Sequence, residues 1–175
     1  YKDLTGEGEV TPGASTLENH GDLKRIGNNS PRYRVGLNLD SALKGIDFSI
    51  FFQGVLKRDW MFDAGDPYFW GAGSGMWQAA CFEEHMDYWT PENTDAYYPK
   101  PYFNETKNQQ AQDAYMQKAS YLRCKNIQLG YTLPTHITEK AGISNCRIYL
   151  SCDNLFTITG LSSVYDPEVF GSYDG

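Results

Sequence analysis

The sequence of 175 residues lacks several features that would assign it quickly to a class of protein. It has no run of about 18 apolar residues, which a transmembrane helix requires. Its four cysteines form no Cys-x-x-Cys pair, so neither a zinc site nor a thioredoxin-like site is indicated. Positive charge is also scarce, because 15 Lys and Arg stand against 22 Asp and Glu and the formal net charge is -7. We therefore expect no nucleic-acid partner.

The sequence also offers little that could do catalysis. Its three histidines are scattered without the spacing of metal ligands, so we expect no metal site and no cofactor. Glu83, Glu84 and Asp87 supply paired carboxylates of the kind that a glycosidase uses, but nothing else in the chain supplies a catalytic frame. We therefore do not expect an enzyme.

Aromatic residues and alternating segments are what the chain has in abundance. Aromatics make up 15% of the residues, which suits strands, stacking surfaces and membrane-interface girdles. Polar and apolar side chains alternate within 32–43, 46–57, 121–133 and 145–156. A period of two predicts four β-strands, each with one apolar and one polar face. Leu43-Lys44-Gly45 predicts a tight turn that joins the first two strands into a hairpin.

Strict alternation assigns the side chains of these strands to two faces. The apolar face is expected to hold Tyr33, Val35, Leu37, Leu39, Phe48, Ile50, Phe52, Ile127, Leu129, Tyr131, Ile148 and Leu150. The polar face is expected to hold Arg34, Asn38, Asn126, Gln128, Arg147, Tyr149 and Asp153. Cys124 falls on the polar face and Cys152 on the apolar face, so we expect free thiols. Arg123 and Lys125 fall on the apolar face, as a basic band toward the upper end of the third strand.

The connections are sorted by length between the two ends of the expected sheet. The tight turn and the connector 134–143, with one helical turn, lie at one end, whereas 1–31, 58–119 and 157–175 are long loops at the other. Residues 109–119 are expected to include a short helix. Short turns at one end and long loops at the other are characteristic of outer-membrane barrels. The expected strands are also longer than the usual strand length of roughly five or six residues.

Two other architectures remain open from the residues alone. In a soluble carbohydrate-binding β-sandwich, the apolar faces would form an interior core and the aromatic segment a binding surface. A fragment of a glycoside hydrolase is a weaker alternative. The sorted loops and the long strands favour the barrel.

Six motifs are spread over most of the chain and occur in a recognisable order. They are residues 21–28, 33–39, 44–54, 88–93 (Tyr-Trp-Thr-Pro-Glu-Asn), 121–134 and 148–157. In these motifs the chain resembles the C-terminal barrel region of the SusC/RagA-type TonB-linked (TonB-dependent) outer-membrane proteins of Bacteroidetes. The resemblance implies an all-β fold with antiparallel strands of a transmembrane outer-membrane β-barrel, here a partial one of about four long strands with long extracellular loops.

The resemblance also implies an organisation and a function. Residues 1–175 correspond to the C-terminal part of a TonB-dependent receptor barrel whose plug domain and last strand are absent, with 58–119 as a long extracellular loop. The full protein is expected in the bacterial outer membrane, as an importer of glycan oligosaccharides or peptides. Its implied partners are a SusD-like lipoprotein and, through the missing N-terminal region, the TonB complex.

All four tryptophans lie in the segment 58–119, and they are our candidates for ligand binding: Trp60, Trp70, Trp77 and Trp89. Sugars stack their C–H faces on indole rings while neighbouring polar groups bind the hydroxyls. The competing interpretation is that these rings pack the loop against itself or against a lid partner. We expect the motif at 88–93 to be structural, because a motif shared by a family does not read a variable substrate.

Overall fold

We describe the protein from a computed structural model, which describes residues 1–74, 80–102 and 107–169. The chain forms two compact units. The loop unit comprises Tyr1–Asn28 and Trp60–Met116, and the sheet unit comprises Asn29–Asp59 and Gln117–Gly175. Within the described ranges, no helix is both long enough and apolar enough to cross a bilayer.

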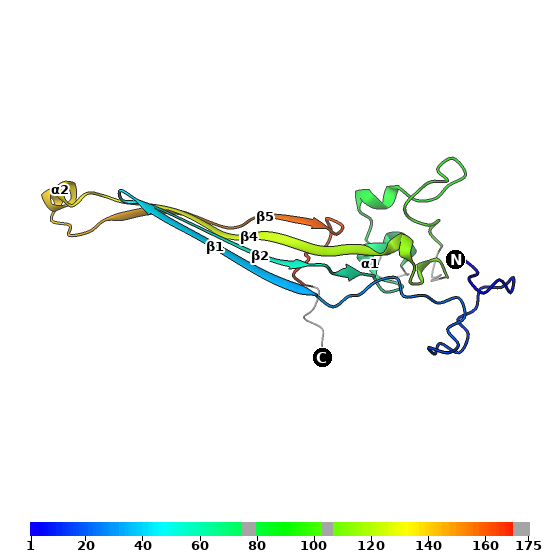
Figure 1. Ribbon diagram of the computed structural model, residues 1–175. Helices are drawn as coiled ribbons and strands as arrows, with labels where there is room; N and C mark the ends of the chain where they lie inside the picture. Colours follow the sequence, from blue (N-terminus) through cyan, green and yellow to red (C-terminus); the bar gives the residue numbers. More distant parts are fainter. Residues whose placement is uncertain (75–79, 103–106, 170–175) are drawn as a thin grey trace. The chain divides into compact units, whose positions relative to one another are not determined.

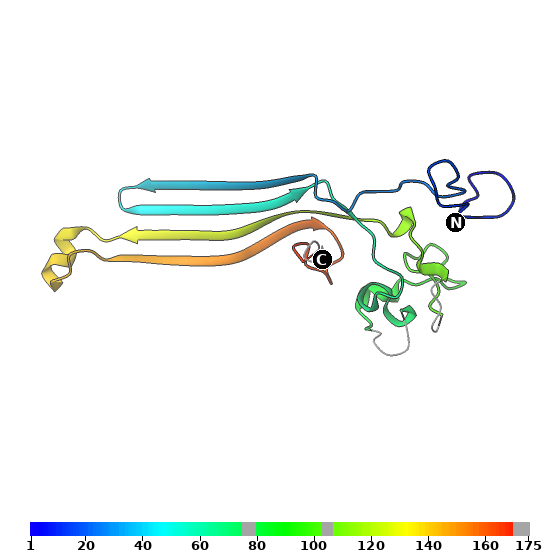
Figure 2. The ribbon, with the colours of Figure 1, turned by 90° about the horizontal axis from the view of Figure 1, so that it is seen from below.

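The sheet unit is built from four long antiparallel strands (Figures 1 and 2). These are β1 (Tyr33–Leu43), β2 (Ile46–Leu56), β4 (Gln117–Thr132) and β5 (Arg147–Gly160). They lie side by side in the order β1, β2, β4, β5. A two-residue strand, β3 (Asp59–Trp60), follows β2. The four strands expected from the alternation are confirmed, and β4 and β5 are longer than predicted.

Both short connections lie at the same end of the sheet (Figure 2). Lys44 and Gly45 join β1 to β2 with φ of 51° and 85°, and two positive φ values in a two-residue turn match the twist of the flanking strands. The connector between β4 and β5 folds as α2 (Thr135–Thr138) and η5 (Glu139–Ala141), and it ends at Gly142 with φ of 73°. The tight turn and the helical connector are thus confirmed.

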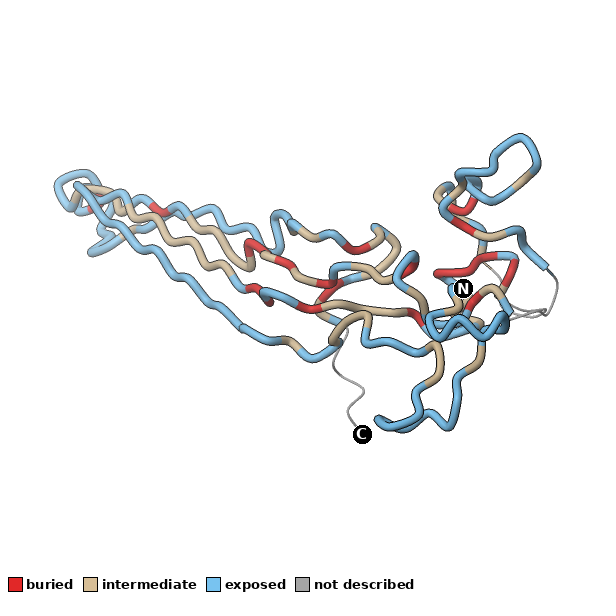
Figure 3. The backbone as a smooth tube through the Cα atoms, turned by 45° about the vertical axis from the view of Figure 1, so that its right-hand side comes forward, coloured by how far each residue is buried: buried red, intermediate tan, exposed pale blue. Residues whose placement is uncertain are grey.

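The apolar face of the sheet is exposed. Leu39 pairs with Ile50, Ile50 pairs with Ile127, and the side chains of the expected apolar set share this face. Leu37 is 52% exposed and Leu150 is 75% exposed, and β1 is exposed along its whole length (Figure 3). Among the described residues there is one sheet, and no second sheet covers this face. The shared face is therefore confirmed, and the β-sandwich alternative, which needs this face buried, is wrong.

The polar face carries hydrogen bonds between strands. Asn126 donates from Nδ2 to Oδ1 of Asp153 at 2.7 Å. Arg147 donates from Nε to Asp47 at 3.0 Å and from its guanidinium to Oε1 of Gln128 at 3.1 Å. Cross-strand polar pairs of this kind stabilise a hydrated sheet face. The polar side chains that alternation placed together do meet.

A bulge in β4 changes which side chains share a face. Phe51 of β2 pairs with Asn126, whereas the next residue, Phe52, pairs with Cys124, so Lys125 is an extra residue. One extra residue shifts the alternation beyond it by one position. Cys124 therefore lies beside Phe52 on the apolar face, and the prediction that it shares the polar face is wrong. All four cysteines are free thiols, as expected.

The same bulge turns Arg123 toward the polar face. Arg123 pairs with Gln53 and Thr157, and its Nε donates to Oγ1 of Thr157 at 2.7 Å. The carboxylate of Glu168 contacts Arg123 at 2.8 Å and Lys125 at 3.1 Å. We expected these two cations to form a basic band on the apolar face. That prediction is wrong, because the bulge and the acidic segment that follows β5 draw both side chains to one carboxylate.

In the described part of the loop unit the helices are short turns, and residues 1–31 form no helix or strand, as expected. The helix expected within 109–119 is limited to one turn, because β4 already begins at Gln117 and Ala119 donates its backbone N–H to the carbonyl of Arg58 at 2.9 Å. The elements of this unit are α1 (Pro67–Trp70), η1 (Gly71–Gly73), η2 (Glu83–Met86), η3 (Lys107–Gln109) and η4 (Asp113–Tyr115).

Candidate functional site

The loop unit packs around the fully buried ring of Phe69. Phe62 stacks on it with ring centroids 4.4 Å apart, and Trp70 meets it edge-on at 4.7 Å. Tyr98 packs against the same ring at 5.7 Å. The carboxylate of Asp66 caps α1 by accepting the backbone N–H of Phe69 at 2.9 Å. The aromatic richness of this segment thus supplies a core, with offset and edge-on pairs as aromatic rings prefer.

His85 ties two loops to this core. Its Nδ1 accepts the backbone N–H of Phe82 at 3.0 Å, so its Nε2 carries the proton and donates to the carbonyl of Phe69 at 3.1 Å. Gly71, with φ of 56°, lies against the imidazole, and a Cβ there would come within 2.7 Å of Nδ1. Both ring nitrogens of this buried histidine are engaged, so it holds structure rather than a metal ion.

The motif at 88–93 also holds a loop together. Thr90 and Asn93 exchange backbone hydrogen bonds of 3.2 and 3.1 Å. The carboxylate of Asp87 accepts from Nδ2 of Asn93 at 3.1 Å and from the backbone N–H of Tyr97 at 3.1 Å. Trp89 donates its backbone N–H to the carbonyl of Tyr98 at 2.9 Å. These contacts support the structural role that we expected for this motif.

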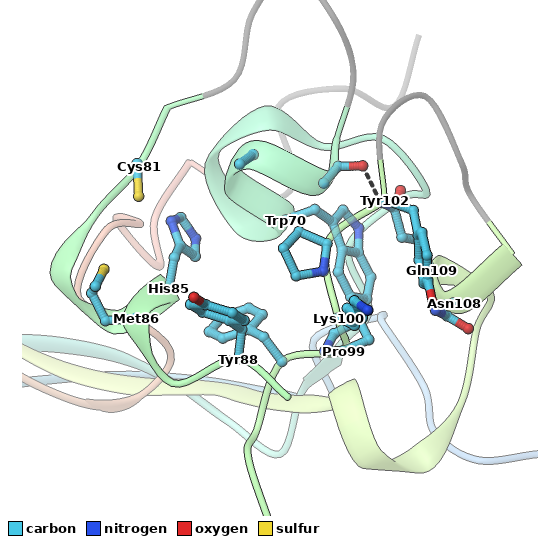
Figure 4. Close-up of a pocket in the computed structure, with 14 residues that line it drawn as sticks. Trp70, Cys81, His85, Met86, Tyr88, Pro99, Lys100, Tyr102, Asn108 and Gln109 are labelled. Carbon is cyan, nitrogen blue, oxygen red and sulfur yellow. Dashed lines mark hydrogen bonds between the residues drawn. The ribbon is translucent and has the colours of Figure 1, made fainter. Parts of the chain in front are cut away.

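A hollow of about 260 Å³ opens beside the aromatic core (Figure 4). Asn108 and Gln109 lie at one end of it, and Cys81 and Met86 lie at the other. Lys100 is the one lysine or arginine among its described lining residues. Six of its 14 lining residues are aromatic or proline residues, namely Trp70, Tyr88, Tyr98, Pro99, Pro101 and Tyr102.

Several polar groups around the hollow are already satisfied. Gln109 is buried, donates from Nε2 to the carbonyl of Gly73 at 2.6 Å, and accepts the backbone N–H of Gly65 at 2.7 Å. Burial, with a smaller contribution from the nearby charge of Glu84, raises the pKa of Tyr98 above its ordinary value, so its hydroxyl keeps its proton at neutral pH. A ligand in the hollow therefore meets apolar walls, neutral hydroxyls and one cation.

The structure separates the candidate tryptophans by environment. Trp70 is 5% exposed, donates from Nε1 to the carbonyl of Asp63 at 2.8 Å, and lines the hollow. Trp89 is 38% exposed, and Trp60 is half-buried in β3. Trp77 lies outside the described residues. Of the three described tryptophans, Trp70 alone lines the hollow.

Sequence reasoning missed Lys100 and the tyrosines that surround it. All four Trp lie in this segment and indole rings are favoured for stacking, but Tyr88 and Tyr102, which also line the hollow, are 36% and 51% exposed, whereas Trp70 is 5% exposed. The signal that was available is Pro99-Lys100-Pro101, because a cation between two prolines sits on a stiff, extended backbone.

Comparisons with known proteins agree with the fold. No family model matches the chain. Over 168 residues, 96% of this chain, it is 30% identical to TonB-dependent receptor P3 of Formosa agariphila and 24% identical to TonB-dependent receptor P26 of the same organism. The chain spans 15% and 16% of the lengths of these relatives.

Solved structures give the same result. The RagAB peptide importer in its open-open state matches 81% of this chain at 27% identity with a TM-score of 0.60. The closed-closed state matches 83% at 27% identity with a TM-score of 0.61. The chain covers 15% of each of those chains. The relatives are named as receptors and importers rather than as enzymes.

The long antiparallel strands, the exposed apolar face and these matches define the chain as part of an outer-membrane β-barrel. The resemblance seen in the six motifs is confirmed. The chain is a barrel segment of the SusC/RagA-type, TonB-dependent outer-membrane proteins.

Proposed function

We propose that the full-length protein is a TonB-dependent importer in the bacterial outer membrane, which takes up glycan oligosaccharides or peptides together with a SusD-like surface lipoprotein. The observation that carries the proposal is the similarity to TonB-dependent receptors over 96% of the chain, together with a sheet whose apolar face is exposed as a lipid-facing surface requires. The TonB complex is proposed to supply the energy for transport.

The partner and the transport can be tested together. The tagged full-length protein is purified from solubilised outer membranes, and copurifying proteins are identified by mass spectrometry. We expect a SusD-like lipoprotein in stoichiometric amount, and recovery without one counts against the partnership. Uptake of labelled oligosaccharides and oligopeptides, measured with and without a functional TonB complex, tests the import itself. Uptake that does not depend on TonB contradicts the proposal.

The loop 58–119 is proposed to be extracellular and to help enclose the ligand, with Trp60, Trp70, Trp77 and Trp89 as anchors. Its aromatic density and its hollow support this role. Calorimetric titration of the purified importer compares wild type with each Trp→Ala variant. Loss of a stacking ring should weaken binding by roughly 1–3 kcal/mol, the scale for burying a large apolar side chain. Unchanged affinity in all four variants removes this segment from the binding site.

Peptides are the first ligands to test. The solved structures that match this chain are those of a peptide importer, and that likeness supports a peptide cargo over a neutral oligosaccharide. Competition between an oligopeptide mixture and an oligosaccharide mixture in the titration distinguishes the two, because only the true cargo class displaces a bound labelled ligand.

A further inference from the structure

We propose that the hollow of the loop unit is a subsite for a carboxylate-bearing end group of the imported ligand. The Lys100 ammonium binds the carboxylate, and the aromatic and proline walls cover the apolar part of the same group. This inference rests on the proposed import function and adds the chemistry of one end of the cargo.

Two prolines restrict the backbone at Lys100, and its ammonium group lies beside a tyrosine ring. Pro99 fixes the backbone on one side, and Pro101 restricts Lys100 itself to an extended conformation. Its Nζ lies 5.6 Å from the ring centroid of Tyr102, within the range of a cation–π contact. Both residues line the hollow. These contacts place the exposed ammonium group at the hollow, where it can reach a bound anion.

The charge at the hollow is uncompensated within the described part of the chain. None of the salt bridges between described residues involves Lys100. No described Asp or Glu lines the hollow. The amide oxygen of Gln109 is already bonded to Gly65, so among the lining side-chain amides Asn108 is the one left to accept a sugar hydroxyl. A cation that has no described carboxylate in the lining of its own hollow favours an anionic group.

The size of the hollow limits what enters. About 260 Å³ is below the roughly 300–1,000 Å³ of a cleft for a whole drug-sized ligand. The hollow therefore accepts one residue or one ring, not the whole cargo. Two groups combine a carboxylate with an apolar or C–H face of that size: the C-terminal residue of a peptide and the uronic acid unit of an oligosaccharide. The proposal concerns their shared chemistry, and the experiment separates them.

The test measures, by saturation-transfer difference NMR, the binding of two pairs of probes to the purified full-length importer. The pairs are N-acetyl-L-phenylalanine against its amide, and D-galacturonic acid against its methyl ester. At least one of the two acids should bind, and the affinity of its uncharged counterpart should be lower by about tenfold or more. Tenfold is the scale for one charge-assisted hydrogen bond. If N-acetyl-L-phenylalanine alone binds, the end group of the cargo is a peptide C-terminus. If galacturonic acid alone binds, the end group is an acidic sugar.

Three variants connect the effect to Lys100. Lys100→Met should lower the affinity for the acid probe by roughly tenfold to a hundredfold, and Lys100→Arg should retain most of that affinity. Lys140→Met, which changes an exposed lysine in η5, is the matched control and should bind like wild type. An unaltered heat-induced gel shift shows that Lys100→Met still folds. Equal binding of acid and uncharged probes, or unchanged affinity in Lys100→Met, overturns the proposal.

The subsite and the import function fail in different ways. If the importer takes up peptides or oligosaccharides but shows no preference for acid probes, the subsite is wrong and import stands. If the acid preference depends on Lys100 but no TonB-dependent uptake is found, the subsite stands and import is wrong.

Discussion

Asp47 and Arg147, 100 residues apart in the sequence, meet across β4 in the space that the absent side chain of Gly130 leaves open. Arg147 Nε lies 3.0 Å from Oδ1 of Asp47. A Cβ on Gly130 would come within 2.5 Å of both the guanidinium and the carboxylate. Gly130, close to the C-terminal end of β4, therefore leaves room for an ion pair between β2 and β5.

The first prediction concerns Gly130→Ala. The methyl group should displace the Asp47–Arg147 pair and lower the thermal midpoint of the full-length barrel, although alanine is ordinarily favoured over glycine in a strand interior. In a background that carries both Asp47→Ala and Arg147→Gln the two obstacles are gone, and the same substitution should stabilise by about 0.5–1 kcal/mol. Thermal unfolding of the four variants in detergent gives this cycle. A stabilising Gly130→Ala in the wild-type background contradicts the role of Gly130.

The second prediction compares neighbours on opposite faces of β1. Leu37 lies on the exposed apolar face and Asn38 on the polar face. Leu37→Arg should cost about 2–4 kcal/mol if the site is near the bilayer midplane, whereas Asn38→Arg should cost much less. Folding into lipid vesicles, followed by gel shift against urea concentration, measures both. Equal costs would show that the apolar face does not face lipid.

The third prediction concerns the segment after β5, which is attached to the polar face of the sheet. The largely buried Arg123 guanidinium contacts Asp166 at 2.8 Å and Glu168 at 2.8 Å. Arg123→Gln should weaken this attachment by about 1–3 kcal/mol, the range for hydrogen bonds to charged groups and for the polar partners left behind. Hydrogen exchange at residues 161–169 should then accelerate. Arg34→Gln, on β1, is the control and should leave exchange there unchanged.

The fourth prediction gives the pH dependence of the same attachment. The hydrogen bond from Arg123, and a smaller contribution from the backbone N–H of Glu168, hold the pKa of the Asp166 carboxyl below its ordinary value. A lowered folded-state pKa stabilises at pH values above the unfolded pKa of about 3.9, and this contribution disappears as pH falls through the lower folded value. The protection factors of the amides at 161–169, which correct for the intrinsic pH dependence of exchange, should thus be steady from pH 7 to pH 5 and fall below pH 4. In the Asp166→Asn variant the amides at 161–169 should already exchange fast at pH 7, and their protection should not fall further below pH 4.

The fifth prediction separates two tryptophans of the loop unit. Trp70 is buried against Phe69 and Tyr115, so Trp70→Ala should cost roughly 3–5 kcal/mol, as for other large core side chains. Trp89 is far more exposed, so Trp89→Ala should cost less. Limited proteolysis within 60–116 reports the stability of the unit. Similar protease resistance for the two variants would show that Trp70 is not a core residue.

Much of the sheet was predictable from local pattern. Alternation of period two needs no knowledge of the partner strand, so the four strands and most of both faces follow from it. The turn at Lys44-Gly45 is equally local, because two positive φ values are a property of those two residues. The family motifs then identified the barrel, since they are contiguous stretches of the chain.

The bulge at Lys125 was not predictable from alternation. The bulge is recognised only when β4 is paired with β2, because an extra residue is one that has no partner on the neighbouring strand. Counting along one strand therefore assigned Cys124 and Arg123 to the wrong faces. The acidic residues that Arg123 contacts are more than 40 positions away, which no local pattern reports.

The sequence by itself determined the strands, the short turns and the class of protein, because each depends on neighbours along the chain. Only the tertiary structure decided which aromatic rings form a core and which line a hollow. The sequence made Trp70 a candidate and passed over Lys100, but the first packs on Phe69 and the second stays exposed beside Tyr102. Burial depends on what the rest of the chain brings to a residue, and that is set by contacts between segments distant in sequence.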